Sequence, residues 1–128
     1  MADVLIVDED PEVRTMLGWY LAVLGHEVRG ACSATEALDA ITSQSPDAII
    51  LDVELSGMSG HDLLSVVHSQ CLAPDASVVV QSARNDNATL VRSWELGASV
   101  HLSNPVAPEA VAEAVARHLA PRSLALAG

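Results

Sequence analysis

Short apolar runs alternate along the chain with longer segments in which apolar residues recur at helical spacing. A strand of a parallel sheet is covered on both faces, so an unbroken apolar run predicts such a strand, whereas the periodic segments predict helices. The predicted strands are 4–7, 26–32, 48–51, 77–81 and 100–103. A helical segment follows each of them, so the pattern predicts a succession of strand–helix units.

Capping residues mark where the predicted helices begin. Asp10 is expected to cap the first helix, with Pro11 at its first position and Gly25 just past its end. The second helix opens with the spacing of a capping box. The start signals of the later helices are Ser33 with Glu36, Ser59 with Asp62, the segment 85–87, and Pro108.

The succession of units predicts an α/β fold, a five-stranded parallel sheet with helices on both faces. The first, third and fourth strands are apolar and should be central, whereas the mixed second and fifth strands should be edges. This arrangement fits the strand order 2-1-3-4-5 of the flavodoxin-like doubly wound fold. The predicted domain covers 1–120, and we interpret 121–128 as a C-terminal tail or the start of a linker.

The chain is strongly acidic. Its 128 residues, the size of one domain, carry 17 acidic side chains against six arginines and no lysine, for a formal net charge of −11. Because phosphate backbones are bound by clustered cations, direct nucleic-acid binding is disfavoured. No apolar segment approaches the ~20 residues of a membrane span and no signal-peptide pattern opens the chain, so we expect a cytoplasmic protein without membrane contact.

Cysteine, histidine and tryptophan residues suggest no separate site. Cys32 and Cys71 lack metal-ligand spacing, and we expect buried, reduced thiols rather than a disulfide. His61 and His68 share a helix face without a third ligand, so we assign them no role. Trp94 is expected to pack half-buried on the fourth helix or to form part of a docking face there.

Acidic residues follow two of the apolar strands. Asp8 and Glu9 follow the first strand, and Asp52 ends the third. In an open parallel sheet, ligands bind beyond the carboxyl ends of the strands where the strand order reverses, which here lies between these two strands. Like charges in one crevice destabilise each other unless a cation joins them, and oxygen ligands alone favour Mg²⁺. Asp10 is interpreted as a helix cap only.

Several motifs occur together in a recognisable order over residues 3–120. They are VLIVDEDP at 4–11, IILD at 49–52, MSG at 58–60, SA at 82–83, GA at 97–98, and Pro105. In order and spacing they resemble bacterial response-regulator receiver domains of two-component systems. The resemblance implies that Asp52 is the phospho-acceptor and that Mg²⁺ is held by Asp8, Glu9, Asp52 and the backbone carbonyl of Glu54. It also implies that the Ser82 hydroxyl contacts the phosphoryl group.

The same resemblance implies partners. The phosphoryl group would come from a sensor histidine kinase or a phosphotransfer protein, and the altered surface would be read by a downstream effector or output domain. A homodimer, if formed, would use the face of the fourth helix, fifth strand and fifth helix, which is the family's output surface.

The chain departs from the family pattern at several positions. Asn104 stands where the family has a lysine, His101 at the aromatic switch position, and Ser56 in place of a proline. Arg84 and Glu54 occupy positions that modulate the lifetime of the phosphoryl group. Our hypothesis is that Arg84 turns toward the phosphoryl group or pairs with Glu54; a solvated loop arginine is the alternative.

Two further interpretations concern the fifth strand and the residues after it. His101 could titrate near neutral pH and couple the switch to protonation, or it could be a partly exposed edge-strand ring. The Asn104–Pro105 bond is, by resemblance, a candidate cis peptide.

Three functions remain open, of which a phospho-accepting signalling receiver is favoured. The second is a receiver-like interaction module that signals without efficient phosphorylation, suggested by Asn104. The third is an aspartate-nucleophile phosphatase, suggested by the Asp-x-Asp pattern at 8–10. The third is disfavoured because Glu12 stands where that class needs Thr or Val, and because the chain has no lysine. We therefore expect a signalling domain rather than an enzyme.

Overall fold

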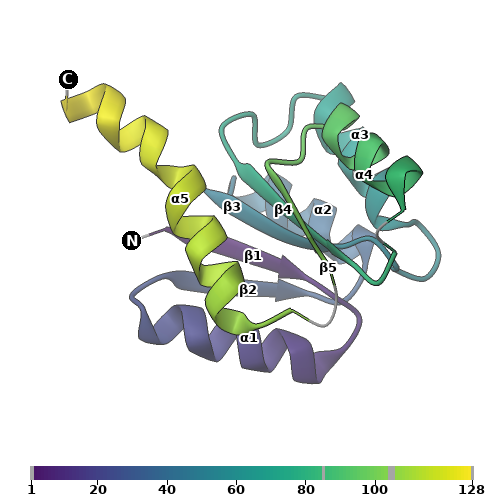
Figure 1. Cartoon of the computed structure of the whole chain (residues 1–128), viewed down its shortest axis with the longest axis horizontal. Coiled ribbons are helices and arrows are strands. Elements are labelled where there is room, and N and C mark those ends of the chain that lie inside the picture. The colour runs from purple at the N-terminus through teal and green to yellow at the C-terminus, as the bar shows by residue number, and fades with distance from the viewer. Residues whose placement is uncertain (1, 85, 104–105, 128) are drawn as a thin grey trace.

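Strands and helices alternate along the described part of the chain (Figure 1). The structure, a computed structural model, describes residues 2–84, 86–103 and 106–127, with side chains described as far as Leu119. The strands are β1 (Asp3–Val7), β2 (Glu27–Ala31), β3 (Ala48–Asp52), β4 (Ser77–Ser82) and β5 (Val100–Ser103). The helices are α1 (Pro11–Val23), α2 (Ala34–Ser43), α3 (Gly60–Ser69), α4 (Asn87–Glu95) and α5 (Pro108–Ala127).

The strands form one sheet in the order β2-β1-β3-β4-β5, with every pair parallel. The predicted doubly wound topology is therefore confirmed. The edge strands β2 and β5 are mostly part-exposed, whereas the residues of β4 are all buried. The burial contrast agrees with the mixed and apolar patterns from which the edges were predicted.

Helices cover both faces of the sheet and divide the core into two aliphatic clusters (Figure 1). Alternate residues of a strand point to opposite faces, so Ile6 and Ile50 pack with residues of α1 and α5, while Val7 and Leu51 pack with residues of α2 and α3. Asp52 follows the same alternation as Ile50, which directs it to the α1 and α5 face.

The predicted helix caps largely form. The Asp10 carboxylate accepts a hydrogen bond from the backbone N–H of Glu12 at 2.9 Å, and Ser59 with Asp62 makes a complete capping box. Ser33 accepts from the N–H of Glu36 as expected. The Glu36 carboxylate accepts from the N–H of Cys32 at 2.9 Å, one residue before the cap, rather than from the N–H of Ser33. Only one of the two hydrogen bonds of the predicted capping box is therefore formed.

One expectation from the sequence, the burial of the two cysteines, was wrong. Cys32 and Cys71 are free, as expected, but both are exposed, so the prediction of burial was wrong. Both lie outside the helices and strands, Cys32 between β2 and α2 and Cys71 between α3 and β4, where their apolar character does not place them in the core. Helix α5 continues through 121–127, the segment interpreted as a tail or linker. Within the described residues, no helix combines the length and the apolar character needed to span a membrane.

Gly60 allows α3 to begin directly beneath the end of β3. A Cβ atom at this position would collide with the Asp52 carbonyl oxygen and would lie 2.6 Å from the Cα of Val53. Both obstacles are backbone atoms, which cannot rotate away. The close approach of α3 to Asp52 therefore requires glycine.

We expect Gly60→Ala to lower the free energy of unfolding by about 1–3 kcal/mol, because the added methyl group forces backbone atoms apart. Gly18→Ala is the matched control, since a Cβ in that helix would meet only side-chain carbons, the nearest at 3.4 Å. The control should be neutral or stabilising by up to about 1 kcal/mol. Urea denaturation of both variants measures the difference, and equal midpoints would contradict the expected collision.

Candidate functional site

A cavity of about 440 Å³ lies beyond the carboxyl ends of β1 and β3. These strands are neighbours, and the strand order reverses between them, which is where ligands of doubly wound sheets bind. Its lining residues come mainly from the β1–α1 loop, α1 and the end of β3, and they are Asp8, Asp10, Val13, Met16, Leu17, Asp52, Ala83 and Val106. The structure thus brings the predicted residues Asp8 and Asp52 into one cavity.

Asp8 is buried, with 5% of its surface exposed. Its Oδ1 accepts a hydrogen bond from the backbone N–H of Asp10 at 2.9 Å, and its Oδ2 accepts one from Nε2 of Gln81 at 3.0 Å. Burial is the main cause that raises the pKa of Asp8 above its ordinary value, and the hydrogen bond from Asp10 partly opposes it.

Asp52 ends β3 and is also partly buried. Its Oδ1 accepts a hydrogen bond from the backbone N–H of Glu54 at 3.0 Å. Burial first, and then the charges of Asp8 and Glu54, raise the pKa of Asp52 to about 6. The two aspartates therefore destabilise each other's charged forms.

Glu9 lies outside the lining of this cavity. Its carboxylate accepts hydrogen bonds from the backbone N–H of Ser56 and, at 3.1 Å, from the Ser56 hydroxyl. In the described residues, no group of three or more His, Cys, Asp or Glu side chains is arranged to hold a metal ion. Of the three carboxylates expected to meet, the structure places two in the cavity, because the Ser56 donors hold the third.

The cavity nevertheless has the chemistry of a magnesium site. Asp8 and Asp52 supply hard oxygen ligands, which Mg²⁺ prefers. Arg14 donates its hydrogen bonds to the backbone carbonyls of Asp8 and Glu9, at 2.6 and 3.1 Å, rather than to a carboxylate, and its charge only partly opposes the raised pKa of Asp8. Both carboxylates with raised pKa therefore retain negative charge for a divalent cation, and the residues fit the ion.

Ser82, the last residue of β4, is completely buried and forms hydrogen bonds on both sides. Its hydroxyl donates to Oε1 of Glu54 at 2.9 Å and accepts from the backbone N–H of Arg84 at 2.9 Å. The backbone N–H of Ala83 donates to the same Glu54 oxygen at 2.9 Å. Glu54 thus contacts the β4–α4 loop through its carboxylate.

In the structure, Arg84 is a largely solvated loop residue, which was the alternative to a contact with the phosphoryl group or with Glu54. Its side chain is 70% exposed and lies 3.8 Å from the carboxylate of Asp86, not against Glu54. His101 is partly buried, which lowers its pKa, and its Nε2 has no described partner. Asn104 and Pro105 lie outside the described residues, so the candidate cis peptide and the Asn104 contact stay predictions.

Two residues near the site were missed at the level of sequence. Gln81 is in register with Asp52 and is buried to 1% exposure, yet it was counted as part of an apolar strand. A polar side chain at the end of a buried strand was the available signal. His61, to which no role was assigned, contacts the buried Ser93 of α4 through its Nε2 at 2.9 Å, so it packs between α3 and α4.

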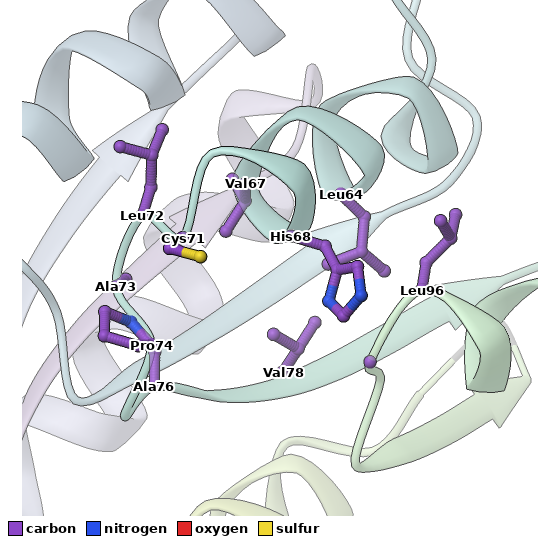
Figure 2. Close-up of a pocket in the computed structure, with 11 residues that line it drawn as sticks. Leu64, Val67, His68, Cys71, Leu72, Ala73, Pro74, Ala76, Val78 and Leu96 are labelled. Carbon is purple, nitrogen blue, oxygen red and sulfur yellow. The ribbon is translucent and has the colours of Figure 1, made fainter.

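A second cavity, of about 290 Å³, lies near the amino-terminal end of β4 (Figure 2). Leu64, Val67 and Val78 line it together with the partly polar side chains of His68 and Cys71. Neither a carboxylate nor an arginine is among its lining residues. It therefore lacks the oxygen ligands that Mg²⁺ prefers and the positive charge that favours a phosphoryl group.

Comparison with known proteins gives consistent matches. Residues 4–116 match the sequence profile of the response regulator receiver domain family. The transcriptional regulatory protein KdpE of Mycobacterium tuberculosis is 35% identical over 105 residues, which cover 82% of this chain and 45% of KdpE. Sporulation initiation phosphotransferase F of Bacillus subtilis is 28% identical over 116 residues, covering 91% of this chain and 92% of that protein.

The fold is equally well matched among solved structures. The crystal structure of a CheY-like response regulator receiver domain protein from Methanospirillum hungatei JF-1 superposes with a TM-score of 0.89 at 25% identity. The match covers 96% of this chain and 97% of that chain. The chain thus spans less than half of the length of KdpE, but nearly all of the Methanospirillum protein.

The raised pKa of Asp52 predicts an unusual dependence of stability on pH. The pKa of about 6 in the folded protein exceeds the ordinary value of 3.8. Between these values the folded protein binds more protons than the unfolded chain, so the free energy of unfolding falls as the pH rises through this window. Asn at position 52 cannot ionise and still offers an Oδ1 acceptor to Glu54.

Without divalent cations, we expect Asp52→Asn to be more stable than the wild type at pH 8 by about 1–2 kcal/mol, a value reduced for partial solvent screening. The difference should shrink as the pH falls and vanish below about pH 3, where Asp52 is protonated in both states. Thermal or urea denaturation across this range measures it. Parallel pH profiles for the two proteins would show that Asp52 is not destabilised by its surroundings.

Proposed function

Because the chain belongs to the response regulator receiver domain family, we propose that it accepts a phosphoryl group on Asp52 and switches a partner-binding surface. Members of this family are signalling domains of two-component systems. The observation that carries the proposal is the position of Asp52, at the end of β3 in one cavity with Asp8 and with a raised pKa.

The carboxylate of Asp52 is the proposed nucleophile. It attacks the phosphorus atom of a phosphohistidine, the P–N bond breaks, and the electron pair of that bond returns to the imidazole nitrogen of the donor. Mg²⁺, when bound, offsets the repulsion between the attacking carboxylate and the phosphoryl anion. We propose Asp8, Asp52 and the backbone carbonyl of Glu54 as its ligands, with Glu9 completing the set once it leaves Ser56.

Phosphorylation changes the local charge and hydrogen bonding. It replaces one negative charge with nearly two and adds three acceptor oxygens. Ser82 is the proposed contact of the phosphoryl group, because it is the hydroxyl at the end of the neighbouring strand. Since the N–H of Arg84 donates to the Ser82 hydroxyl, a change at Ser82 is passed to the loop before α4. His101 and Asn104 are proposed to take part in the switch.

The proposed partners follow from the family. A sensor histidine kinase or phosphotransfer protein donates the phosphoryl group in the cytoplasm, and an effector or output domain reads the changed surface. The face formed by α4, β5 and α5 is the proposed output and dimer surface. Val91 and Trp94 on α4 are 53% and 51% exposed, so Trp94 is half-buried, and the exposed parts of both side chains could contact a partner. We propose no enzymatic turnover of an external substrate and no direct nucleic-acid contact.

A second candidate function is favoured by one observation, Asn104 in place of the family's lysine. A receiver-like interaction module that signals without efficient phosphorylation would tolerate this change. An amide donates a hydrogen bond but supplies no charge to the phosphoryl group. The two functions differ in whether Asp52 becomes phosphorylated.

We expect acetyl phosphate with Mg²⁺ to add one phosphoryl group to the protein, detected by mass spectrometry and mapped to Asp52. Asp52→Asn should abolish the addition, because an amide cannot attack phosphorus. Asp39→Asn, which removes one exposed charge from α2, should leave it unchanged. Absence of the adduct at saturating phosphodonor and Mg²⁺ would favour the interaction module.

We expect Asn104→Lys to raise the affinity for beryllofluoride, a mimic of the phosphoryl group, by about tenfold or more, because charge-assisted hydrogen bonds are the stronger kind. Isothermal titration with and without Mg²⁺ measures the change. An unchanged affinity would mean that another group already supplies the missing positive charge.

A further inference from the structure

We propose that Glu54 is an internal stand-in for the phosphoryl group. Its carboxylate occupies the hydrogen-bond donors that the group on Asp52 must take over, so phosphorylation has to displace Glu54. This inference rests on the proposed function. It adds that the Glu54 carboxylate and the phosphoryl group compete for the same hydrogen-bond donors, and that this competition sets how readily the switch responds.

The geometry places one oxygen of Glu54 at the meeting point of two donors. The Ser82 hydroxyl and the Ala83 N–H both lie 2.9 Å from Oε1 of Glu54. Since the Ser82 oxygen also accepts from the N–H of Arg84, its proton is directed toward Glu54. An anionic oxygen bound by a hydroxyl and an adjacent backbone N–H is the arrangement that a phosphoryl oxygen would need here.

The position of these donors relative to Asp52 makes the competition direct. Ser82 lies one residue beyond Gln81, which is the register partner of Asp52 in β3. Ala83 lines the same cavity as Asp52 and Asp8. A phosphoryl group on Asp52 therefore projects into the space that the donors of Ser82 and Ala83 face.

Glu54 is held in this position against electrostatic repulsion. Its charge is one of the causes that raise the pKa of Asp52, so the two carboxylates repel each other. The described ion pairs include none with Glu54. When both carboxylates are ionised, the hydrogen bonds from Ser82 and Ala83 are thus what keeps Glu54 beside Asp52.

Phosphorylation must change this balance. The phosphoryl group brings nearly two negative charges beside Glu54 and competes for both donors. Repulsion then expels the Glu54 carboxylate into solvent, which its exposed position permits. The unphosphorylated domain has Glu54 bound to the β4–α4 loop, and the phosphorylated domain has the phosphoryl group bound in its place.

The test compares Glu54→Ala, Glu54→Gln and the wild type for binding of Mg²⁺ alone and of beryllofluoride at saturating Mg²⁺. Without its competitor, Glu54→Ala should bind beryllofluoride about tenfold more tightly, because the free donors no longer have to be released first. The affinity for Mg²⁺ alone should change much less. Glu54→Gln keeps an acceptor but loses the charge, so its gain should be smaller than that of Glu54→Ala.

Glu12→Ala is the matched control, since it removes one exposed acidic charge from the first turn of α1 at the same edge of the sheet. It should leave the affinity for beryllofluoride nearly unchanged. The gain in beryllofluoride affinity from Glu54→Ala should also be smaller in a Ser82→Ala background, because one of the two donors for which Glu54 competes is then absent. An equal gain from Glu12→Ala would attribute the effect to net charge and would overturn the inference.

Direct evidence comes from the amide resonance of Ala83 in the unphosphorylated protein. Glu54→Ala should shift it strongly, and Glu12→Ala should not. If the wild type and Glu54→Ala bind beryllofluoride equally well, the inference fails and the proposed function stands. If neither protein binds beryllofluoride, the proposed function fails and the inference falls with it.

Discussion

The site depends on an unfavourable pairing, the placement of Asp8 and Asp52 in one partly buried cavity. The topology imposes this pairing, because β1 and β3 are hydrogen-bonded parallel neighbours whose carboxyl ends coincide. Burial and like charge raise the pKa of both side chains. The N–H groups of Asp10 and Glu54 offset part of that cost. The remaining imbalance is what the proposed Mg²⁺ ion would offset.

The surrounding polar groups orient the carboxylates without neutralising them. Gln81 donates a neutral amide to Asp8, so the carboxylate is held in place and keeps its full charge. Arg14 binds the carbonyl oxygens of Asp8 and Glu9, which fixes the β1–α1 loop. A cation paired directly with Asp8 would weaken the attraction for a metal ion. Because the neutral Gln81 amide binds the Asp8 carboxylate and the charged Arg14 binds only backbone carbonyls, the attraction of Asp8 for a metal ion is retained.

Hydrogen bonds at the same edge of the sheet connect Asp52, the proposed phospho-acceptor, to the surface. Glu54, two residues after Asp52, binds Ser82 and Ala83, and the Ser82 oxygen binds the N–H of Arg84. This chain of hydrogen bonds runs from β3 through the end of β4 to the loop that precedes α4. In the proposed switch, the anion that occupies the donors of Ser82 and Ala83 sets the conformation of that loop, and a local change of charge reaches the proposed partner-binding face.

The order of the elements, the strand order and the meeting of Asp8 with Asp52 were all predictable from sequence. Each follows from a local pattern: apolar runs mark central strands, and residues that follow neighbouring parallel strands meet at one edge.

The tertiary structure alone decided which partner each polar side chain takes. Glu9 binds Ser56 rather than the cavity, Glu54 binds Ser82, and Gln81 binds Asp8. Cys32 and Cys71 are exposed for a similar reason, since composition does not say which loops are covered. Alternation along a strand specifies the face on which a side chain lies, but several donors lie within reach on that face. The choice among them is made by distances between residues far apart in the chain, which only the folded arrangement sets.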